Sequence, residues 1–202
     1  MPSTTFEVKT TSLFRKYPGN PILKPQGDHW ESHAVFNAAA WTDGEQVYLL
    51  YRAEGPCNFD RPFTSRIGLA TSRNGLTFWQ RHSLPVIEPT EAYEIPGGCE
   101  DPRLVHIQGS FYMTYTAYDG HHARIALATR TNLYDWKKAG LLFPERGWTK
   151  SAAILTEPIN GRYWMYFGDT NIWAAYSTDL LSWTIIEEPV LFPREGCFDS
   201  RL

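Results

Sequence analysis

Three segments of the chain repeat one pattern, and this repeat constrains the fold more than any other feature. Each copy has a short apolar strand, a polar turn with Asn or Asp, and a tryptophan. The copies read IGLATSRNGLTFW (67–79), IALATRTNLYDW (125–136) and IWAAYSTDLLSW (172–183). Their starts lie about 50 residues apart, a period typical of propeller blades and solenoid units. The repeat therefore predicts one structural unit that is built several times.

Two strands precede each copy of the repeat, and an apolar, proline-containing exit follows it. The strand directly before each copy is rich in Tyr and alternates in polarity: EQVYLLYRA (45–53), GSFYMTYTAY (109–118) and GRYWMYFGD (161–169). The strand before that one carries a polar residue near its start: FNAAAW (36–41), EDPRLVHI (100–107) and KSAAIL (150–155). Four strands per unit at this period predict β-propeller blades. The predicted blade units are residues 35–87, 99–143 and 150–192, with the start of a fourth at 198.

The composition favours an all-β fold. Aromatic residues make up 15% of the sequence and alternate with Gly, Pro, Asn and Asp turns, whereas no stretch keeps a helical period for three turns. A β-sandwich with a coincidental repeat is the alternative. Three units and one strand do not close a propeller, because closure is what removes exposed sheet edges. We therefore expect a propeller truncated after about three blades, and the sequence leaves association into a homo-oligomer open.

Charge and hydropathy exclude several functions. The net charge of −3 arises from 22 acidic and 19 basic residues spread along the chain, so no basic face for a nucleic acid is expected. The sequence shows neither a signal peptide nor an apolar run long enough to span a membrane, which predicts a cytoplasmic protein without a membrane partner. Three widely separated cysteines fit neither a disulfide framework nor a zinc site. We predict no metal and no nucleotide cofactor.

Polar residues gather at the starts of the predicted inner strands. The innermost strands of a propeller line its central channel, so matching positions converge there. The repeat assigns matching places to Asn37, Asp101 and Lys150, and Asp199 is a fourth candidate. Asp101 follows directly on Glu100. A carboxylate at the mouth of an aromatic-lined channel suits a general acid that cleaves glycosidic bonds.

Several aromatic residues and a histidine pair are further candidates for ligand contact. The aromatic candidates, whose faces would suit sugar rings but which also suit an ordinary core, are Trp30, Trp41, Tyr118 and Trp173. Adjacent histidines on a strand would face opposite sides. We therefore expect His121 and His122 to lie in a loop, with one ring contacting the ligand, rather than to bind a metal.

Six short motifs carry a resemblance to a known family. They are NPIL (20–23), VFNAAA (35–40), YLLYRAEG (48–55), SRIGLATS (65–72), GGCEDPRLV (97–105) and TAYDG (116–120). Together they resemble glycoside hydrolase family 130, the β-mannoside phosphorylases and related β-mannosidases, over nearly the whole chain from about Leu13. The resemblance implies a five-bladed propeller and an inverting reaction, in which phosphate or water attacks the anomeric carbon from the face opposite the acid.

The resemblance also implies roles for individual residues. Asp101 matches the catalytic acid, which in the family delivers its proton to the leaving oxygen through the 3-hydroxyl group of the sugar. Arg52, Arg66 and Lys150 match positions on the side of the phosphate or nucleophile, where guanidinium groups suit phosphate oxygens, and we place His122 with them. The residues expected to contact the sugar are Asn37, Arg103, Tyr118, Asp169 and Asp199.

The sequence departs from the family's phosphorylases after the third Tyr-rich strand. MYFGDTN (165–171) stands where many of them carry a His-Arg pair that helps to hold phosphate. The predicted function is therefore inverting cleavage of β-mannosidic linkages in manno-oligosaccharides, with hydrolysis slightly ahead of phosphorolysis. A hydrolase would need a glutamate as general base, which we expect beyond Leu202. No cofactor is predicted, and inorganic phosphate is the co-substrate in the phosphorolytic case.

Three alternatives stay open from the sequence. The first is phosphorolysis that releases mannose 1-phosphate. The second is a sugar-binding propeller without catalysis, because propellers serve many unrelated functions. The third is a five-bladed glycosidase of another family that acts on arabinan or fructan, which would need an acidic residue in place of Asn37.

Overall fold

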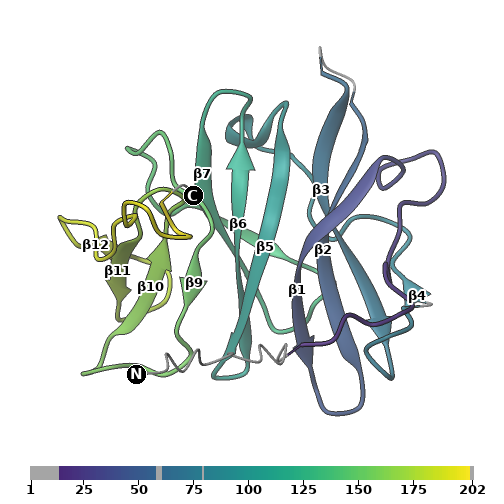
Figure 1. Cartoon of the computed structure of the whole chain (residues 1–202), viewed down its shortest axis with the longest axis horizontal. Helices are drawn as coiled ribbons and strands as arrows, with labels where there is room; N and C mark the ends of the chain where they lie inside the picture. The colour runs from purple at the N-terminus through teal and green to yellow at the C-terminus, as the bar shows by residue number, and fades with distance from the viewer. Residues whose placement is uncertain (1–13, 58–60, 79, 201–202) are drawn as a thin grey trace, which may run out of the picture.

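The computed structural model describes residues 14–57, 61–78 and 80–200 of the 202-residue chain, and this part is all-β, as predicted. Twelve β-strands are joined by turns and by one 3-10 helix, η1 (Ala92–Glu94) (Figure 1). Over the same residues, no helix has the length and apolar character needed to cross a membrane.

The strands fall into three groups of four, each an antiparallel meander. The first unit contains β1 (Ala34–Thr42), β2 (Val47–Pro56), β3 (Phe63–Ser72) and β4 (Gln80–Arg81). The second contains β5 (Gly98–Ile107), β6 (Ser110–Tyr118), β7 (Ala123–Arg130) and β8 (Lys137–Leu141). The third contains β9 (Ala153–Ile154), β10 (Tyr163–Phe167), β11 (Trp173–Ser177) and β12 (Thr184–Ile185).

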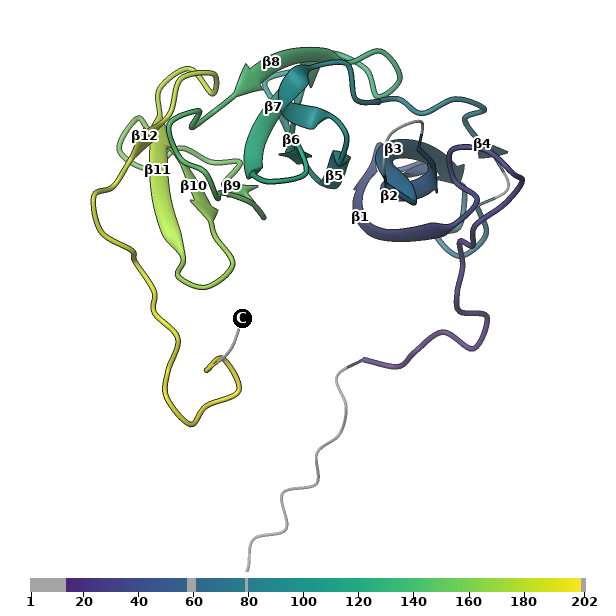
Figure 2. The same cartoon turned by 90° about the horizontal axis from the view of Figure 1, so that it is seen from above.

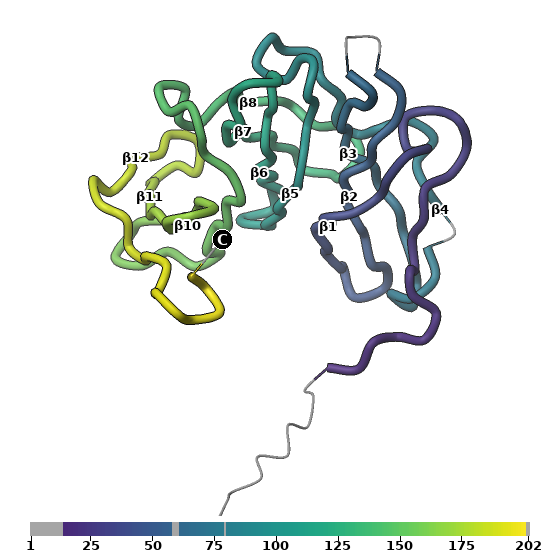
Figure 3. The backbone as a smooth tube through the Cα atoms, turned by 45° about the horizontal axis from the view of Figure 1, so that its top comes forward, coloured from purple at the N-terminus to yellow at the C-terminus, as the bar shows by residue number. Residues whose placement is uncertain are grey.

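The three units follow one another along an arc (Figures 2 and 3). In Figure 2 the first strands β1, β5 and β9 lie on the concave side of the arc, and β4, β8 and β12 lie on the convex side. The first strands of the three units therefore lie on the same side of the arc.

Parallel pairing joins neighbouring units, between Ala123 and Trp148 at the second boundary as well as at the first. Strands β3 and β5 pair in parallel at Ser65 and Gly98, so that the first eight strands form one sheet, whereas β9–β12 form a separate sheet. Gly98 has a φ of 113°, and a Cβ atom at this position would clash with the backbone carbonyl of Ser65. Glycine is therefore required here, because only it combines this backbone conformation with so close an approach.

Apolar side chains of the alternating strands form the core. Buried residues of β2, β3, β6 and β7 pack in one cluster that spans the first two units, including Leu50, Leu69, Met113 and Tyr115. A second cluster lies under the third unit around Met165 and reaches back to the second. This packing fixes the inner strands, so the groups at their starts are held on a rigid support.

Candidate active site

One residue near the start of each inner strand has a left-handed backbone. These residues are Asn37 (φ 47°), Asp101 (φ 50°) and Ser151 (φ 59°). Strand pairing resumes two residues later in every unit: Ala39 pairs with Leu50, Arg103 with Thr114 and Ala153 with Tyr166. The three residues are therefore structurally equivalent. Left-handed conformations of non-glycine residues cost about 1–3 kcal/mol each and gather at functional sites.

The predicted match of Lys150 with Asn37 and Asp101 is wrong by one residue. Ser151 occupies that place, and Lys150 corresponds to Phe36 and Glu100, which come directly before the other two. The carbonyl of Lys150 accepts a hydrogen bond from the N–H of Gly168, the residue directly after β10. Lys150 and Ser151 are both polar, and periodicity alone does not say which of two adjacent polar residues takes the left-handed conformation.

Asp101 is held by two donors from the first unit. The side-chain amide of Asn37 donates to Asp101 Oδ1 at 2.9 Å, and Arg52 Nη1 lies 3.3 Å from the same oxygen. The Asp101 side chain is 20% exposed. Asn37 was expected to contact the sugar and Arg52 to lie on the phosphate side, yet both contact the predicted acid.

The guanidinium group of Arg52 is shared by three carboxylates. Besides Asp101, its Nη2 lies 2.8 Å from Glu54 Oε1 and 3.0 Å from Glu100 Oε1, and its Nε donates to Ser65 Oγ at 3.0 Å. Arg52 is 16% exposed. Most of its donors are therefore engaged within the protein. We refer to Asn37, Arg52, Glu54, Glu100 and Asp101 as the acid cluster.

The neighbouring carboxylates Glu100 and Asp101 face the same cation because of the irregularity in β5. Pairing between β5 and β6 shifts register between Glu100 and Arg103, around the left-handed Asp101. Burial raises the pKa of Glu100; Arg52 opposes this shift, and the charges of Asp101 and Glu54 add to it. Glu100 has no predicted role, and no sequence motif indicates its contact with Arg52.

A second group of side chains lies at the edge of the third unit that adjoins the second, where Trp148 pairs with Ala123 of the second unit. Asp169 Oδ2 accepts a hydrogen bond from the indole N–H of Trp148 at 2.7 Å and lies 3.5 Å from Lys150 Nζ. The ammonium group of Lys150 lies 5.6 Å from the centre of the Trp148 ring. Burial would raise the pKa of Asp169, but the bond from Trp148 and the charge of Lys150 hold it below its ordinary value. We refer to Trp148, Lys150 and Asp169 as the lysine cluster.

Trp148 was not singled out from the sequence, and it is 55% exposed. The only feature of the sequence that could have indicated a site role is its position two residues before Lys150, at the polar start of the third predicted inner strand. The predicted His121–His122 loop adjoins it, because Ala123 and Trp148 form a parallel bridge. Both histidines are exposed, and His122 Nδ1 lies 3.4 Å from Asp119 Oδ2.

The remaining candidates are not joined to either cluster by a hydrogen bond or ion pair within the described residues. Tyr118 donates to the carbonyl of Gly120 at 2.9 Å, the half-buried Arg66 lies 3.4 Å from the carbonyl of Thr64, and Asp199 accepts from Arg194 at 2.8 Å. Asp199 lies in a turn rather than at the start of a strand.

Arg103 lines a cavity that spans all three units. The cavity has a volume of about 270 Å³, and it is lined by Ala39, Ala40, Arg103, Leu104, Val105, Tyr112, Thr114, Ala153 and Ile154. Because these residues come from β1, β5, β6 and β9, the cavity connects the inner strands. The Arg103 guanidinium donates to the carbonyl of Pro102 at 3.0 Å.

Three of the four aromatic candidates pack against the core. Trp41 packs edge-on against Phe111 with ring centres 4.9 Å apart, and Trp30 stacks on Tyr51. Trp173 packs against the core of the third unit. Their indole rings contribute to packing between strands, which is the more frequent role of such residues.

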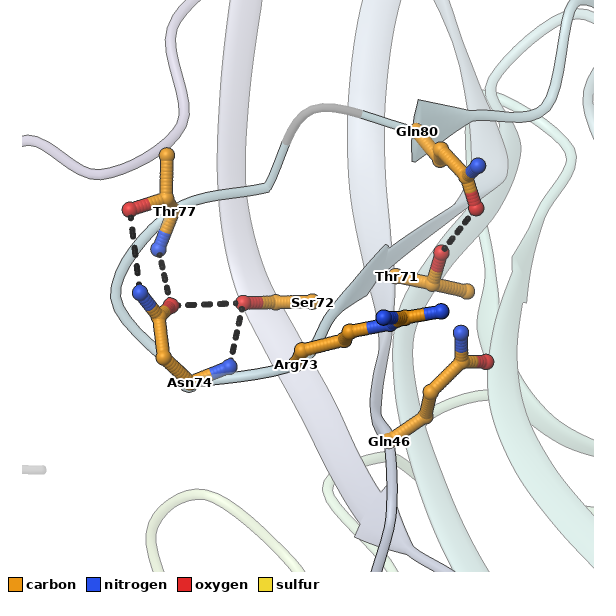
Figure 4. Close-up of a pocket in the computed structure, with 7 residues that line it drawn as sticks. All are labelled: Gln46, Thr71, Ser72, Arg73, Asn74, Thr77 and Gln80. Atoms are coloured by element: carbon orange, nitrogen blue, oxygen red, sulfur yellow. Dashed lines mark hydrogen bonds between the residues drawn. The ribbon is translucent and has the colours of Figure 1, made fainter.

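A larger polar cavity lies at the opposite end of the first unit (Figure 4). It measures about 310 Å³ and is lined by Gln46, Thr71, Ser72, Arg73, Asn74, Thr77 and Gln80. Asn74 bonds to Ser72 and Thr77, and Thr71 bonds to Gln80, so these groups mainly build a turn. Within the described ranges, no group of three or more His, Cys, Asp or Glu side chains could hold a metal ion.

Comparison with known families assigns the chain. A family model described as beta-1,4-mannooligosaccharide phosphorylase matches residues 14–202. The chain belongs to glycoside hydrolase family 130. The resemblance carried by the short motifs is thereby confirmed, and the match includes both clusters.

Two curated relatives and one solved structure support the assignment. The 1,2-beta-oligomannan phosphorylase of Thermoanaerobacter sp. (strain X514) is 37% identical over 193 residues, which are 92% of this chain and 64% of the relative. The beta-1,2-mannobiose phosphorylase of the same strain is 38% identical over 171 residues, 76% of this chain and 54% of the relative. This chain therefore spans less than two thirds of either relative.

The solved structure comes from work on family members that are glycoside hydrolases targeting β-1,2 mannosidic linkages in Candida mannan. It is 35% identical to this chain, with a TM-score of 0.85 over 93% of this chain and 63% of that one. The described residues thus have the same fold as the corresponding part of that protein.

Proposed function

We propose that this protein is a β-mannoside phosphorylase that cleaves manno-oligosaccharides with inorganic phosphate and releases mannose 1-phosphate. The acid cluster carries this proposal, because it offers the carboxylate of Asp101 at a strained backbone position, two residues before Arg103, which lines the cavity between the three inner strands. Both curated relatives are phosphorylases. They favour phosphorolysis, and we therefore reverse the slight preference for hydrolysis drawn from the sequence.

The proposed architecture is a five-bladed propeller in which the three described units are blades. The blade boundaries are those predicted from the repeat, 35–87, 99–143 and 150–192. The arc of the three units supports this arrangement, with their first strands on its concave side.

Asp101 is the proposed general acid. It transfers a proton, through the 3-hydroxyl group of the mannose, to the oxygen of the breaking glycosidic bond. A phosphate oxygen forms a bond to the anomeric carbon from the opposite face, and the bond electrons leave with the protonated oxygen, so the configuration inverts. Such a reaction needs room for the nucleophile, with the acid and the opposite group roughly 6.5–9.5 Å apart.

The two clusters are proposed to divide the work. We move Arg52 from the phosphate side to the acid side, because its contacts with Glu54, Glu100 and Asp101 leave few donors for an anion. Lys150 remains the main phosphate group, with Arg66 and His122 as further candidates. Phosphate would compete with Asp169 for the Lys150 ammonium group.

Sugar binding is proposed for residues that border the cavity and the clusters. Asn37 and Arg103 lie on the inner strands and offer donors to hydroxyl groups. Tyr118, Asp169 and Asp199 stay candidates for the same role. The exposed ring of Trp148 is a further surface on which a sugar could stack.

Hydrolysis is the second candidate function, and two observations favour it. The solved structure at 35% identity comes from work on hydrolases of the family. In addition, the segment MYFGDTN (165–171) stands where many phosphorylases of the family carry a His-Arg pair. The two functions differ in the nucleophile and share the acid.

Product analysis of the full-length protein on β-1,2- and β-1,4-mannobiose, with and without inorganic phosphate, tests the proposal. We expect mannose 1-phosphate to form only when phosphate is present. Release of free mannose at the same rate without phosphate would identify a hydrolase and contradict the proposal. Binding of the disaccharide without turnover under either condition would favour the non-catalytic propeller.

A further inference from the structure

We propose that Glu100 is a positioning residue that holds Arg52, and through it Asp101, in the geometry needed for proton transfer. The inference rests on the proposed role of Asp101 as the general acid. It gives a role to the one carboxylate of the Glu100–Asp101 pair that the family resemblance left unassigned.

The backbone of β5 places both carboxylates on one cation. Neighbouring residues of a regular strand point to opposite faces of the sheet. The left-handed Asp101 and the register shift beside it break this alternation. Asp101 therefore reaches Arg52 Nη1 at 3.3 Å, while Glu100 reaches Nη2 at 3.0 Å.

Glu100 ties Arg52 of the first unit to the second unit. Two adjacent residues of β5 contact the two terminal nitrogens of the guanidinium group, which resists rotation of its plane. Ser65 Oγ supports the same arrangement, because it accepts from Arg52 Nε at 3.0 Å and lies 3.4 Å from Glu100 Oε1. The donors of a guanidinium form a rigid fork, so fixing two of them orients the third.

Glu54 does not replace this contact. It lies two residues from Arg52 on the same strand, β2, and its contact with Nη2 at 2.8 Å runs along that strand. Without Glu100, Arg52 would keep Glu54 and Ser65, both from the first unit. Its remaining contact with β5 would be the longer one to Asp101 itself.

Stability does not explain a third carboxylate at this position. Glu100 is 16% exposed, and its burial beside Asp101 and Glu54 raises its pKa. Like charges that share a single counter-charge oppose one another. A residue kept for positioning can lower stability, because active sites trade stability for function. We therefore expect the neutral variant Glu100→Gln to unfold at the same temperature as the wild type or a higher one.

The experiment compares two substrates in the full-length protein, both with phosphate present. β-1,2-Mannobiose has a poor leaving group and needs the acid, whereas 4-nitrophenyl β-mannoside has a good leaving group and needs it little. The variants are Glu100→Ala, Glu100→Gln and Asp101→Asn, and Glu157→Ala is the exposed control. The kcat and KM values and the thermal unfolding midpoint are measured for each.

For Glu100→Ala we expect kcat on mannobiose to fall about 10- to 100-fold, as misplacement of a catalytic group does. The loss on the nitrophenyl substrate should be at least about fivefold smaller, since the acid contributes little there. Glu100→Gln should recover part of the activity, because its amide oxygen still accepts from Arg52. The control should match the wild type.

Equal losses on both substrates, a fall in the unfolding midpoint of Glu100→Gln, or full mannobiose activity in Glu100→Ala would overturn the inference. Asp101→Asn separates this failure from that of the proposed function. If Asp101→Asn loses mannobiose turnover selectively and Glu100→Ala does not, only the role of Glu100 is wrong. If Asp101→Asn keeps mannobiose turnover, the proposed acid is wrong, and the inference falls with it.

Discussion

The boundary between the first and second units differs from that between the second and third in how deeply its charged side chains are buried. Arg52 and Glu100 at the first boundary are each 16% exposed, whereas Lys150 and Asp169 at the second are each 34% exposed. A parallel pairing crosses both boundaries, Ser65 with Gly98 at the first and Ala123 with Trp148 at the second, so the difference lies in exposure. A general acid works best when it is fixed and shielded, while phosphate must enter from solvent. Equivalent places in the repeated unit thus differ in exposure, which matches the two roles proposed for the acid cluster and the lysine cluster.

The largest effect is expected from a change at Asp101, at the boundary between the first and second units. Asp101→Asn preserves the shape of the side chain and removes the transferable proton. We expect turnover of mannobiose to fall about 100- to 10,000-fold, the usual contribution of a general acid. Steady-state kinetics measure this loss, and an unchanged circular dichroism spectrum shows that the fold is intact. Turnover close to that of the wild type would show that Asp101 is not the general acid.

The second prediction concerns the buried carboxylate that supports the same boundary. Glu94, on η1 between the first and second units, is fully buried, pairs with Lys138 and accepts from the Tyr115 hydroxyl at 2.7 Å. Glu94→Gln leaves Lys138 without its counter-charge, so we expect the free energy of unfolding to fall by about 3–5 kcal/mol. Urea denaturation measures the change, with the exposed Glu187→Gln as control.

The pH dependence of stability has a definite sign at this carboxylate. Burial would raise the pKa of Glu94, but Lys138, the backbone N–H groups of Glu91 and Thr90, and Tyr115 hold it below its ordinary value of about 4.5. A lowered pKa in the folded state adds stability above the ordinary pKa, and this stability is lost as the pH falls through the lowered value. The wild type should therefore lose its advantage over Glu94→Gln on acidification. A constant difference down to pH 3 would contradict this.

The smallest effect on the free energy of unfolding is expected in the lysine cluster. Asp169 also has a lowered pKa, so its ion pair with Lys150 stabilises the fold above pH 3.8 and is lost on acidification. Because solvent screens this exposed pair, Asp169→Asn should cost at most about 1 kcal/mol of unfolding free energy. Denaturation under the conditions used for Glu94→Gln gives the direct comparison. A loss of unfolding free energy as large as that of Glu94→Gln would contradict the expected difference between the two boundaries.

The repeat predicted the strands and the convergence of their starts, because apolar alternation and turn residues are local features of the sequence. It also singled out Asp101 and Asn37, which prove to be in contact. It misplaced Lys150 because an irregular strand carries one extra residue, and periodicity cannot locate that residue among adjacent polar ones. Such a shift changes which side chain faces the channel.

Contacts between units were beyond the reach of the sequence. The meeting of Arg52 with Glu100 depends on how two units dock, which neither strand encodes by itself. Aromatic residues were ambiguous for a similar reason. Trp41 fills the core and Trp148 is exposed, although both stand near the ends of predicted strands.

Phosphate binding tests most directly whether the acid cluster and the lysine cluster have the separate roles proposed for them. Isothermal titration calorimetry would measure the dissociation constant of inorganic phosphate for the wild type, Lys150→Ala and Asp101→Asn. We expect Lys150→Ala to bind about tenfold more weakly, a change of about 1.4 kcal/mol, and Asp101→Asn to stay within about threefold of the wild type. Loss of phosphate binding in Asp101→Asn, together with wild-type affinity in Lys150→Ala, would contradict these separate roles.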